Sequence, residues 1–169
     1  MSSRQPEGLT RVDFFTMTHR ISAQVQTGAR PLSDLLNDRS QSYLLVFSVV
    51  VVPLGQATGK DRSRAAYAYL SKENLSFVVV PSRQARAPER SRYAVVEREV
   101  LATLPGFEVR GRFLGPQRAD LWGFSPAILE PFLVLAEAEA RITATPEVTF
   151  SGEAILVNRS RLESLCLVE

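Results

Sequence analysis

Short stretches in which apolar and polar residues alternate dominate this chain. The clearest are "ISAQV" (residues 21–25) and "VRGRF" (residues 109–113), and a period of two is typical of strands with one buried face. The longest apolar run, Tyr43 to Val52, has ten residues, whereas a membrane-spanning helix needs about 20. Valine supplies half of this run and favours strands, and Pro53 ends it, so we expect a strand.

The same order of patterns occurs twice along the chain. Residues 10–28 align with 98–116 at a spacing of 88, and the apolar run 43–52 aligns with 132–141 at a spacing of 89. We interpret this as an internal duplication. The first copy is expected to contain strands over 11–17, 19–27 and 43–52 and a closing hairpin over 68–81. The second copy is expected to contain strands over 98–104, 107–114 and 132–141 and a hairpin over 154–169. A short helix or turn is expected at 31–38 and at 118–124.

These patterns predict an all-β fold with minor α content, arranged as two tandem five-stranded barrels. The expected organisation is a flexible tail over 1–9, a first barrel over 10–81, a basic linker over 82–97 and a second barrel over 98–169. The last part of the linker fits either one or two helical turns or an extension of the next strand.

The closing hairpins resemble those of the Sm-like (SH3-like) barrel family. In that family a hydrophobic residue, an Arg-Gly pair, an Asp-Asn pair and a second hydrophobic residue precede the last strand. Residues 70–75 ("LSKENL") and 157–162 ("VNRSRL") occupy these places, although the Arg-Gly pair itself is replaced in both copies. The chain also resembles an uncharacterised bacterial protein family with an internal duplication and "LSDLLN"-like segments. The Sm-like resemblance implies a small barrel and, in that family, RNA binding through the hairpin loops.

Composition and charge narrow the classes of partner and the compartment. The formal net charge is +2, too small to favour nucleic acid or an anionic membrane by itself. The single cysteine excludes an intramolecular disulfide, and the first residues lack the apolar segment of a signal peptide. We therefore expect a cytoplasmic protein without a membrane segment.

Residues able to carry chemistry are few and scattered. His19 is the only histidine, and Cys166, between two leucines, is expected to be a small buried residue. Glu137 and Glu139 share a strand face, where a solvated surface is favoured over an acid/base pair. The loop "GQATGKD" has three residues between its glycines, where a phosphate-binding loop needs four. We expect no catalytic residues, no metal, no cofactor and no small-molecule substrate.

A non-enzymatic binding or assembly module, acting through strand edges or strand faces, is therefore the predicted function. Its partner is expected to be a protein or a second copy of the chain. The candidate interface is Ser48, Val50 and Val52, because the aligned positions in the second copy are charged and water-facing. The alternative is an Sm-like RNA-binding protein. Its candidate RNA contacts are Lys72, Asn74, Arg86, Arg110, Arg112, Arg159 and Arg161.

Overall fold

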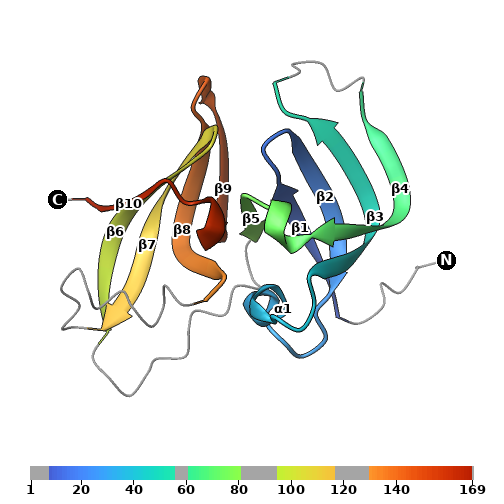
Figure 1. The fold of residues 1–169 in the computed structure, drawn as a ribbon, viewed down its shortest axis with the longest axis horizontal. Coiled ribbons are helices and arrows are strands. Elements are labelled where there is room, and N and C mark those ends of the chain that lie inside the picture. The colour runs from blue at the N-terminus through green and yellow to red at the C-terminus, as the bar shows by residue number, and fades with distance from the viewer. Residues whose placement is uncertain (1–7, 56–60, 81–94, 117–129, 169) are drawn as a thin grey trace.

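The computed structural model describes residues 8–55, 61–80, 95–116 and 130–168 (Figure 1). The first part of the chain contains β1 (Leu9–Phe15), β2 (His19–Gln26), α1 (Leu32–Asn37), β3 (Tyr43–Pro53), β4 (Ser63–Ser71), the 3-10 helix η1 (Lys72–Asn74) and β5 (Phe77–Val80). The second part contains β6 (Val95–Leu104), β7 (Phe107–Pro116), β8 (Phe132–Ile142), β9 (Thr145–Asn158), the 3-10 helix η2 (Arg159–Arg161) and β10 (Ser164–Leu167). We call β1–β5 the first half and β6–β10 the second half.

All ten strands belong to one antiparallel sheet with the order β10-β6-β7-β8-β9-β5-β1-β2-β3-β4. The predicted all-β class with minor helix is confirmed. The predicted arrangement as two barrels is corrected in one respect, since the pairing shows a single open sheet and does not show two closed barrels. The reason is that β5 pairs with β9 and so joins the two halves through their backbones.

The halves correspond in register as well as in strand order. Phe47 lies opposite Tyr67 in the pair β3–β4, and the positions 89 and 87 residues later, Ala136 and Ala154, lie opposite each other in β8–β9. Ser48 and Glu137, also 89 residues apart, are the two non-glycine residues with positive φ among those described. Each lies where the pairing with the preceding strand shifts register, as at a β-bulge.

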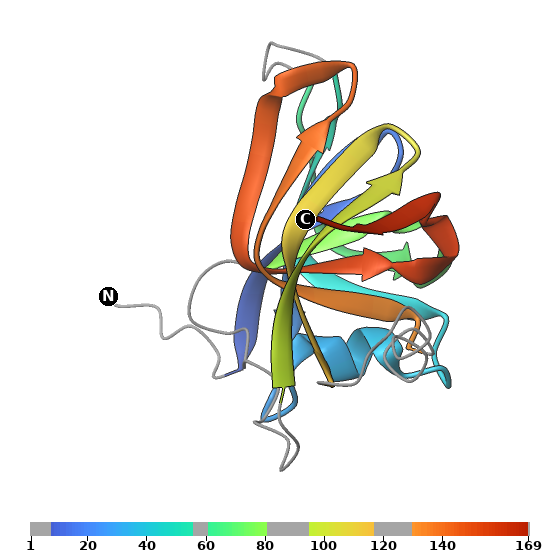
Figure 2. The same cartoon turned by 90° about the vertical axis from the view of Figure 1, so that its left-hand side faces the viewer.

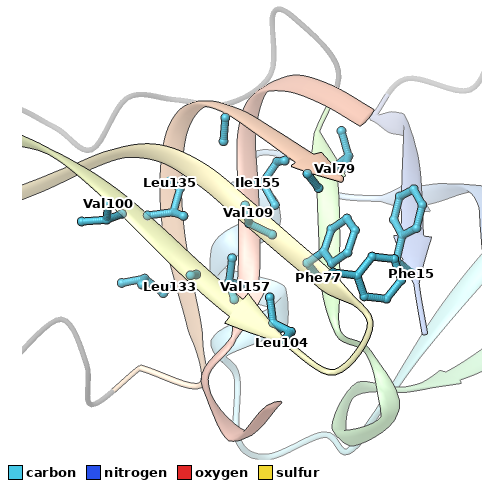
Figure 3. Packing of buried hydrophobic residues seen from close by; sticks show 14 of the residues in the cluster. Phe15, Phe77, Val79, Val100, Leu104, Val109, Leu133, Leu135, Ile155 and Val157 are labelled. Atoms are coloured by element: carbon cyan, nitrogen blue, oxygen red, sulfur yellow. The ribbon is translucent and has the colours of Figure 1, made fainter. Parts of the chain in front are cut away.

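Two apolar clusters form the core, on opposite faces of the sheet where β5 pairs with β9. The first-half cluster consists of Val12, Phe14, Ala23, Val25, Leu32, Leu36, Leu44, Val46, Val49, Leu70, Leu75, Val78, Val80, Phe132 and Leu156. The second-half cluster consists of Phe15, Phe77, Val79, Val100, Ala102, Leu104, Phe107, Val109, Phe113, Leu133, Leu135, Ala138, Ala140, Ile155 and Val157 (Figure 3). Each half therefore contributes side chains to the core of the other.

The segment between the halves ends in a strand. β6 begins at Val95, so the last residues of the predicted linker extend the first strand of the second half, which was one of the two alternatives. Among the described residues, no helix is long and apolar enough to cross a membrane.

Candidate protein-interaction surface

The contact between β5 and β9, which we call the internal junction, is buried and continuous. Phe77 lies opposite Val157, and the pairing runs to Val80 opposite Ala154. All four residues of β5 are buried, as are the four residues of β9 that face them. A strand that is apolar at every position is typical of burial on both faces, and "FVVV" has that pattern.

Side chains cross the internal junction in both directions. Phe132 and Leu156 of the second half are 3% and 2% exposed because they complete the first-half cluster. In return, Phe77 enters the second-half cluster, stacked on Phe15 with 4.5 Å between ring centroids. Figure 3 shows these two rings beside Leu104 and Val157 of the second half. Burial of a phenylalanine is worth about 1.5–3 kcal/mol, so these crossings bind the halves firmly.

A buried asparagine adds polar contacts at one end of the junction. The Nδ2 group of Asn158 donates to the carbonyl oxygens of Leu75 at 2.7 Å and of Lys72 at 3.2 Å. Arg161 donates from Nε to the Glu73 carbonyl at 3.1 Å. The turn that contains η1 therefore has its carbonyls satisfied by the second half, as buried backbone acceptors require.

The two ends of the sheet are β4 and β10, which lie on opposite sides of the molecule (Figure 1). β4 pairs with β3, and among the described strands it has no second neighbour. The outer face of β3 and β4 next to this edge is apolar and exposed. We call Tyr43, Leu45, Tyr67 and Tyr69 the β4 surface; they are 58%, 39%, 61% and 67% exposed.

The β4 surface is continuous across the two strands. Leu45 lies directly opposite Tyr69, and the rings of Tyr67 and Tyr69 meet edge to face with 6.4 Å between their centroids. Tyrosine is enriched in protein interfaces because it combines a large apolar ring with a polar end. Three tyrosines beside an unpaired strand edge are thus typical of a protein contact.

The other end of the sheet is smaller and more polar. Leu165 and Leu167 of β10 pack partly buried against the second-half cluster, whereas Cys166 points the other way and is exposed. Ser164, on the same face as Cys166, lies with its Oγ 2.6 Å from the Thr103 Oγ1. The predicted burial of Cys166 is wrong, because side chains alternate along a strand and the two flanking leucines take the core side. In Figure 2 this end of the molecule faces the viewer, with the C-terminus in front.

The predicted interface residues on β3 lie beside the β4 surface, on the far side of the bulge. Ser48 is exposed with a φ of +50°, while Val50 and Val52 are half-buried. Val50 pairs with Ser22 on one side and Arg64 on the other, so neighbouring strands cover part of it. The largest exposed apolar side chains of this region are the tyrosines, and Tyr67, Tyr69 and Tyr43 lie three, five and seven positions from Val50 along the paired strands.

The predicted RNA contacts among the described residues lie in two groups, Arg110 and Arg112 on β7, and Lys72, Asn74, Arg159 and Arg161 at η1 and η2. Arg110 pairs with Glu99 at 3.5 Å, and Arg112 pairs with Glu97 at 2.8 Å and also contacts Glu137. These arginines lie on β7 of the second half, among carboxylates that neutralise them.

The remaining predicted RNA contacts lie at the junction or outside the described residues. Arg161 donates to the Asn74 Oδ1 at 3.1 Å, and Arg159, half-buried in η2, donates its backbone N–H to the Pro131 carbonyl at 2.9 Å. Arg86 lies outside the described residues.

The side chain of Lys72 binds backbone carbonyls at the end of α1. Its Nζ donates to the carbonyl oxygens of Leu35 at 2.6 Å and Asp38 at 3.0 Å, at the C-terminal end of α1. Burial lowers the pKa of Lys72, and the nearby Asp38 carboxylate opposes that shift. The pKa of Asp38 is itself lowered by hydrogen bonds from the Ser40 side chain and backbone. A cation at a helix C-terminus satisfies unpaired carbonyls, so Lys72 fastens α1 to the turn after β4.

Residues suited to catalysis are not gathered into a site in the part of the chain that the structure describes. The His19 Nδ1 lies 2.7 Å from the Thr18 Oγ1 at the exposed turn before β2. Glu137 and Glu139 are both exposed, and no three metal-binding side chains cluster among the described residues.

Comparison of the chain with family models, curated proteins and solved structures found no match. The resemblance to Sm-like barrels therefore stays a prediction. The candidate site depends on the residues of this chain alone, and the tyrosines were its least expected part. The segment "AYAYLS" did carry a signal, because it places Tyr67 and Tyr69 where the second copy has Ala154 and Leu156.

Proposed function

We propose that this chain is a non-enzymatic binding and assembly module whose protein contact is the edge of β4 with the β4 surface. One observation carries the proposal. β4 holds the same position in the first half that β9 holds in the second, and β9 is paired on both edges, by β8 and β5, whereas β4 is paired only by β3 among the described strands. We further propose that the halves arose by duplication of one five-stranded Sm-like or SH3-like unit, so that both inherited a pairing edge.

Protein is favoured over RNA as the partner by the charges. Phosphate binding needs several cations that face one surface, and RNA recognition usually adds exposed stacking rings between them. Arg64 lies three positions before Tyr67 and Lys72 three positions after Tyr69, but the Lys72 Nζ donates to carbonyls at the end of α1. Arg110 and Arg112 pair with carboxylates on the second half. The β4 surface therefore offers apolar area and backbone groups, which suit strand addition.

The experiment is a measurement of molar mass by light scattering, for the purified chain over a concentration series and for tagged chain in host extract. The variant carries Tyr67→Asp and Tyr69→Asp. The control carries Met17→Asp, at a residue that is 55% exposed in the turn between β1 and β2. We expect the wild type and the control to exceed 18.7 kDa in at least one of the two conditions, and the double variant to remain at that mass.

Two results would contradict the proposal. One is a wild-type chain that stays at 18.7 kDa in both conditions. The other is a double variant that associates as the wild type does. A salt-dependent mobility shift with mixed RNA that Arg110→Gln weakens and the tyrosine variant does not would favour the RNA alternative.

A further inference from the structure

The partner of β4 can be inferred from the strand that already occupies the equivalent place within the chain. At the internal junction β9, the fourth strand of the second half, pairs with β5, the fifth strand of the first half. The ends of the sheet are β4, a fourth strand, and β10, a fifth strand. One chain therefore presents, on opposite sides, the two kinds of strand that join at its centre.

We propose that β4 of one molecule pairs antiparallel with β10 of a second copy of this chain, in the geometry of the internal junction. This inference rests on the proposed function and names its partner. Transfer of the internal register places Leu70 opposite Ser164, Tyr69 opposite Leu165, Ala68 opposite Cys166 and Tyr67 opposite Leu167. The contact is head-to-tail, so every copy added leaves one β4 and one β10 free until a ring closes.

The side chains on the two faces fit this register. Tyr69 takes the place of Leu156, which is 2% exposed at the internal junction, and it would cover Leu165 and Leu167 on the second-half cluster of the next molecule. Cys166 takes the place of Val79 and would face Ala68 and Leu70 on the first-half cluster. The exposed side chains at both ends are thus the ones whose counterparts are buried at the centre.

The segments of β4 and β10 that would pair carry no device that prevents edge pairing. Natural edge strands are commonly protected by lysine, proline or an inward-pointing charge. The segments that would pair, "YAYL" of β4 and "SLCL" of β10, contain no charged residue and no proline. Their composition allows a backbone ladder of four residues on each side.

The chain–chain contact is more polar than the internal junction, which predicts reversible assembly. Thr103, Ser164 and Cys166 stand where the internal junction has Phe15, Phe77 and Val79. Ser71 stands where the internal junction has Asn158, whose side chain makes three hydrogen bonds to η1 carbonyls. Smaller and more polar residues bury less apolar area, so this contact is weaker than the one within the chain.

Register is tested by a disulfide between Cys166 and a new cysteine at Ala68. Opposed residues in an antiparallel pair have Cα atoms about 4.5–5.5 Å apart, which lies within the range a disulfide spans. Oxidised glutathione accepts the two electrons and two protons released when the two thiols join. Ala68→Cys is expected to give a ladder of covalently linked chains that dithiothreitol dissolves, whereas Ala66→Cys, two residues off register, is expected to give little.

The partner of the new cysteine is checked with Ala68→Cys combined with Cys166→Ser, which is expected to remain unlinked. Linked dimers of this double variant would overturn the proposal, because they would show β4 meeting β4. Equal linkage of the Ala66→Cys and Ala68→Cys chains would overturn the register.

Direction is tested by mixing two chains with opposite ends blocked. Tyr69→Arg blocks β4 and Cys166→Arg blocks β10; both side chains are exposed in the free chain, so circular dichroism should show unchanged folds. Each variant alone is expected at 18.7 kDa, and an equimolar mixture at twice that mass. Self-association of the Cys166→Arg chain alone, or an unassociated mixture, would overturn the head-to-tail contact.

The outcome also separates this inference from the proposed function. A purified wild type that stays monomeric, but associates in extract through Tyr67 and Tyr69, would refute self-pairing and leave the β4 surface as a contact for another protein. A wild type that is monomeric in both conditions would refute both.

Discussion

The internal junction and the two ends of the sheet are built from corresponding strands, yet they differ in almost every side chain. At the junction, "FVVV" meets "AILV" and every residue is buried. At the ends, "SLCL" and "YAYL" occupy the same places, and Tyr69 and Cys166 are exposed. The residues at the junction therefore form a permanent core, whereas those at the ends have a composition that tolerates water.

This comparison separates the roles of backbone and side chain in strand pairing. The backbone of β4 offers the same ladder that β9 uses, so geometry alone does not distinguish the two. The two strands are distinguished by the apolar area beside the ladder, because apolar burial supplies most of the free energy of association.

The largest effect is expected for Phe77→Ala at the junction. Phe77 is fully buried between Phe15 and Phe107, so truncation removes a stacked contact and leaves a cavity. We expect the free energy of unfolding in urea to fall by about 4 kcal/mol. The matched change at the end of the sheet, Ser164→Ala, removes a hydrogen bond with the Thr103 Oγ1 and should lower it by only about 0.5–1.5 kcal/mol. Equal losses for the two variants would mean that the ends are as buried as the centre.

A smaller loss is expected for Asn158→Ala. This change leaves the buried carbonyls of Lys72 and Leu75 without their side-chain donor. Unsatisfied buried acceptors cost about 1–3 kcal/mol, and we expect a loss of about 2–3 kcal/mol in chemical denaturation. Ser71→Ala is the control at the corresponding position of β4. A loss as large for Ser71→Ala would show that the turn after β4 relies on its serine, and would contradict the difference between the junction and this end of the sheet.

The strands of this fold were predictable from the sequence because they show either an apolar–polar alternation that marks one buried face or a valine-rich apolar run. The run 43–52 is confirmed as β3, Tyr43–Pro53, and the predicted strand 107–114 lies within β7, Phe107–Pro116. The alternation also places Val49 on the core side, where it is 2% exposed. Such patterns depend only on residues close together in the sequence, so a strand can be predicted without knowledge of the rest of the molecule.

The joining of the halves could not be predicted in the same way. A pattern shows which face of a strand is buried but not which edge is paired, and β5 meets β9 across more than 70 residues of chain. The tyrosines were missed for a related reason. The alignment of the two copies pointed to Val50 and Val52 of β3, whereas the exposed apolar area lies nearer the edge of β4. Only the strand order shows that β4 is at the end of the sheet.

Ser164→Phe transfers a junction feature to the end of the sheet. If β10 meets β4 of another molecule as β5 meets β9, the new ring occupies the place of Phe77 beside Leu70 of the next chain. Burial of the ring is worth about 1.5–3 kcal/mol, and we expect self-association tighter by at least about tenfold in sedimentation equilibrium. Arg110→Phe, on an exposed strand face of the same half, controls for added stickiness. Tighter association of both variants alike would point to non-specific aggregation.

The smallest effect concerns the closest approach at the junction. Gly152 lies where a Cβ atom would sit 2.6 Å from the Val80 carbonyl oxygen, so the second half needs glycine there. The corresponding residue of β4 is Ala65, paired with Val49 as Gly152 is paired with Ala138. In the chain–chain contact the methyl group of Ala65 would hold the next molecule slightly away. Ala65→Gly should therefore tighten self-association about two- to fivefold, although glycine in a strand lowers the stability of the free chain by about 0.5–1 kcal/mol. Sedimentation equilibrium measures the first quantity and urea unfolding of dilute chain the second.

The control is Ala66→Gly, which removes a neighbouring methyl group from β4 and should lower the stability of the chain without tightening self-association. Equal tightening by both changes would show that the chain–chain contact does not have the geometry of the internal junction.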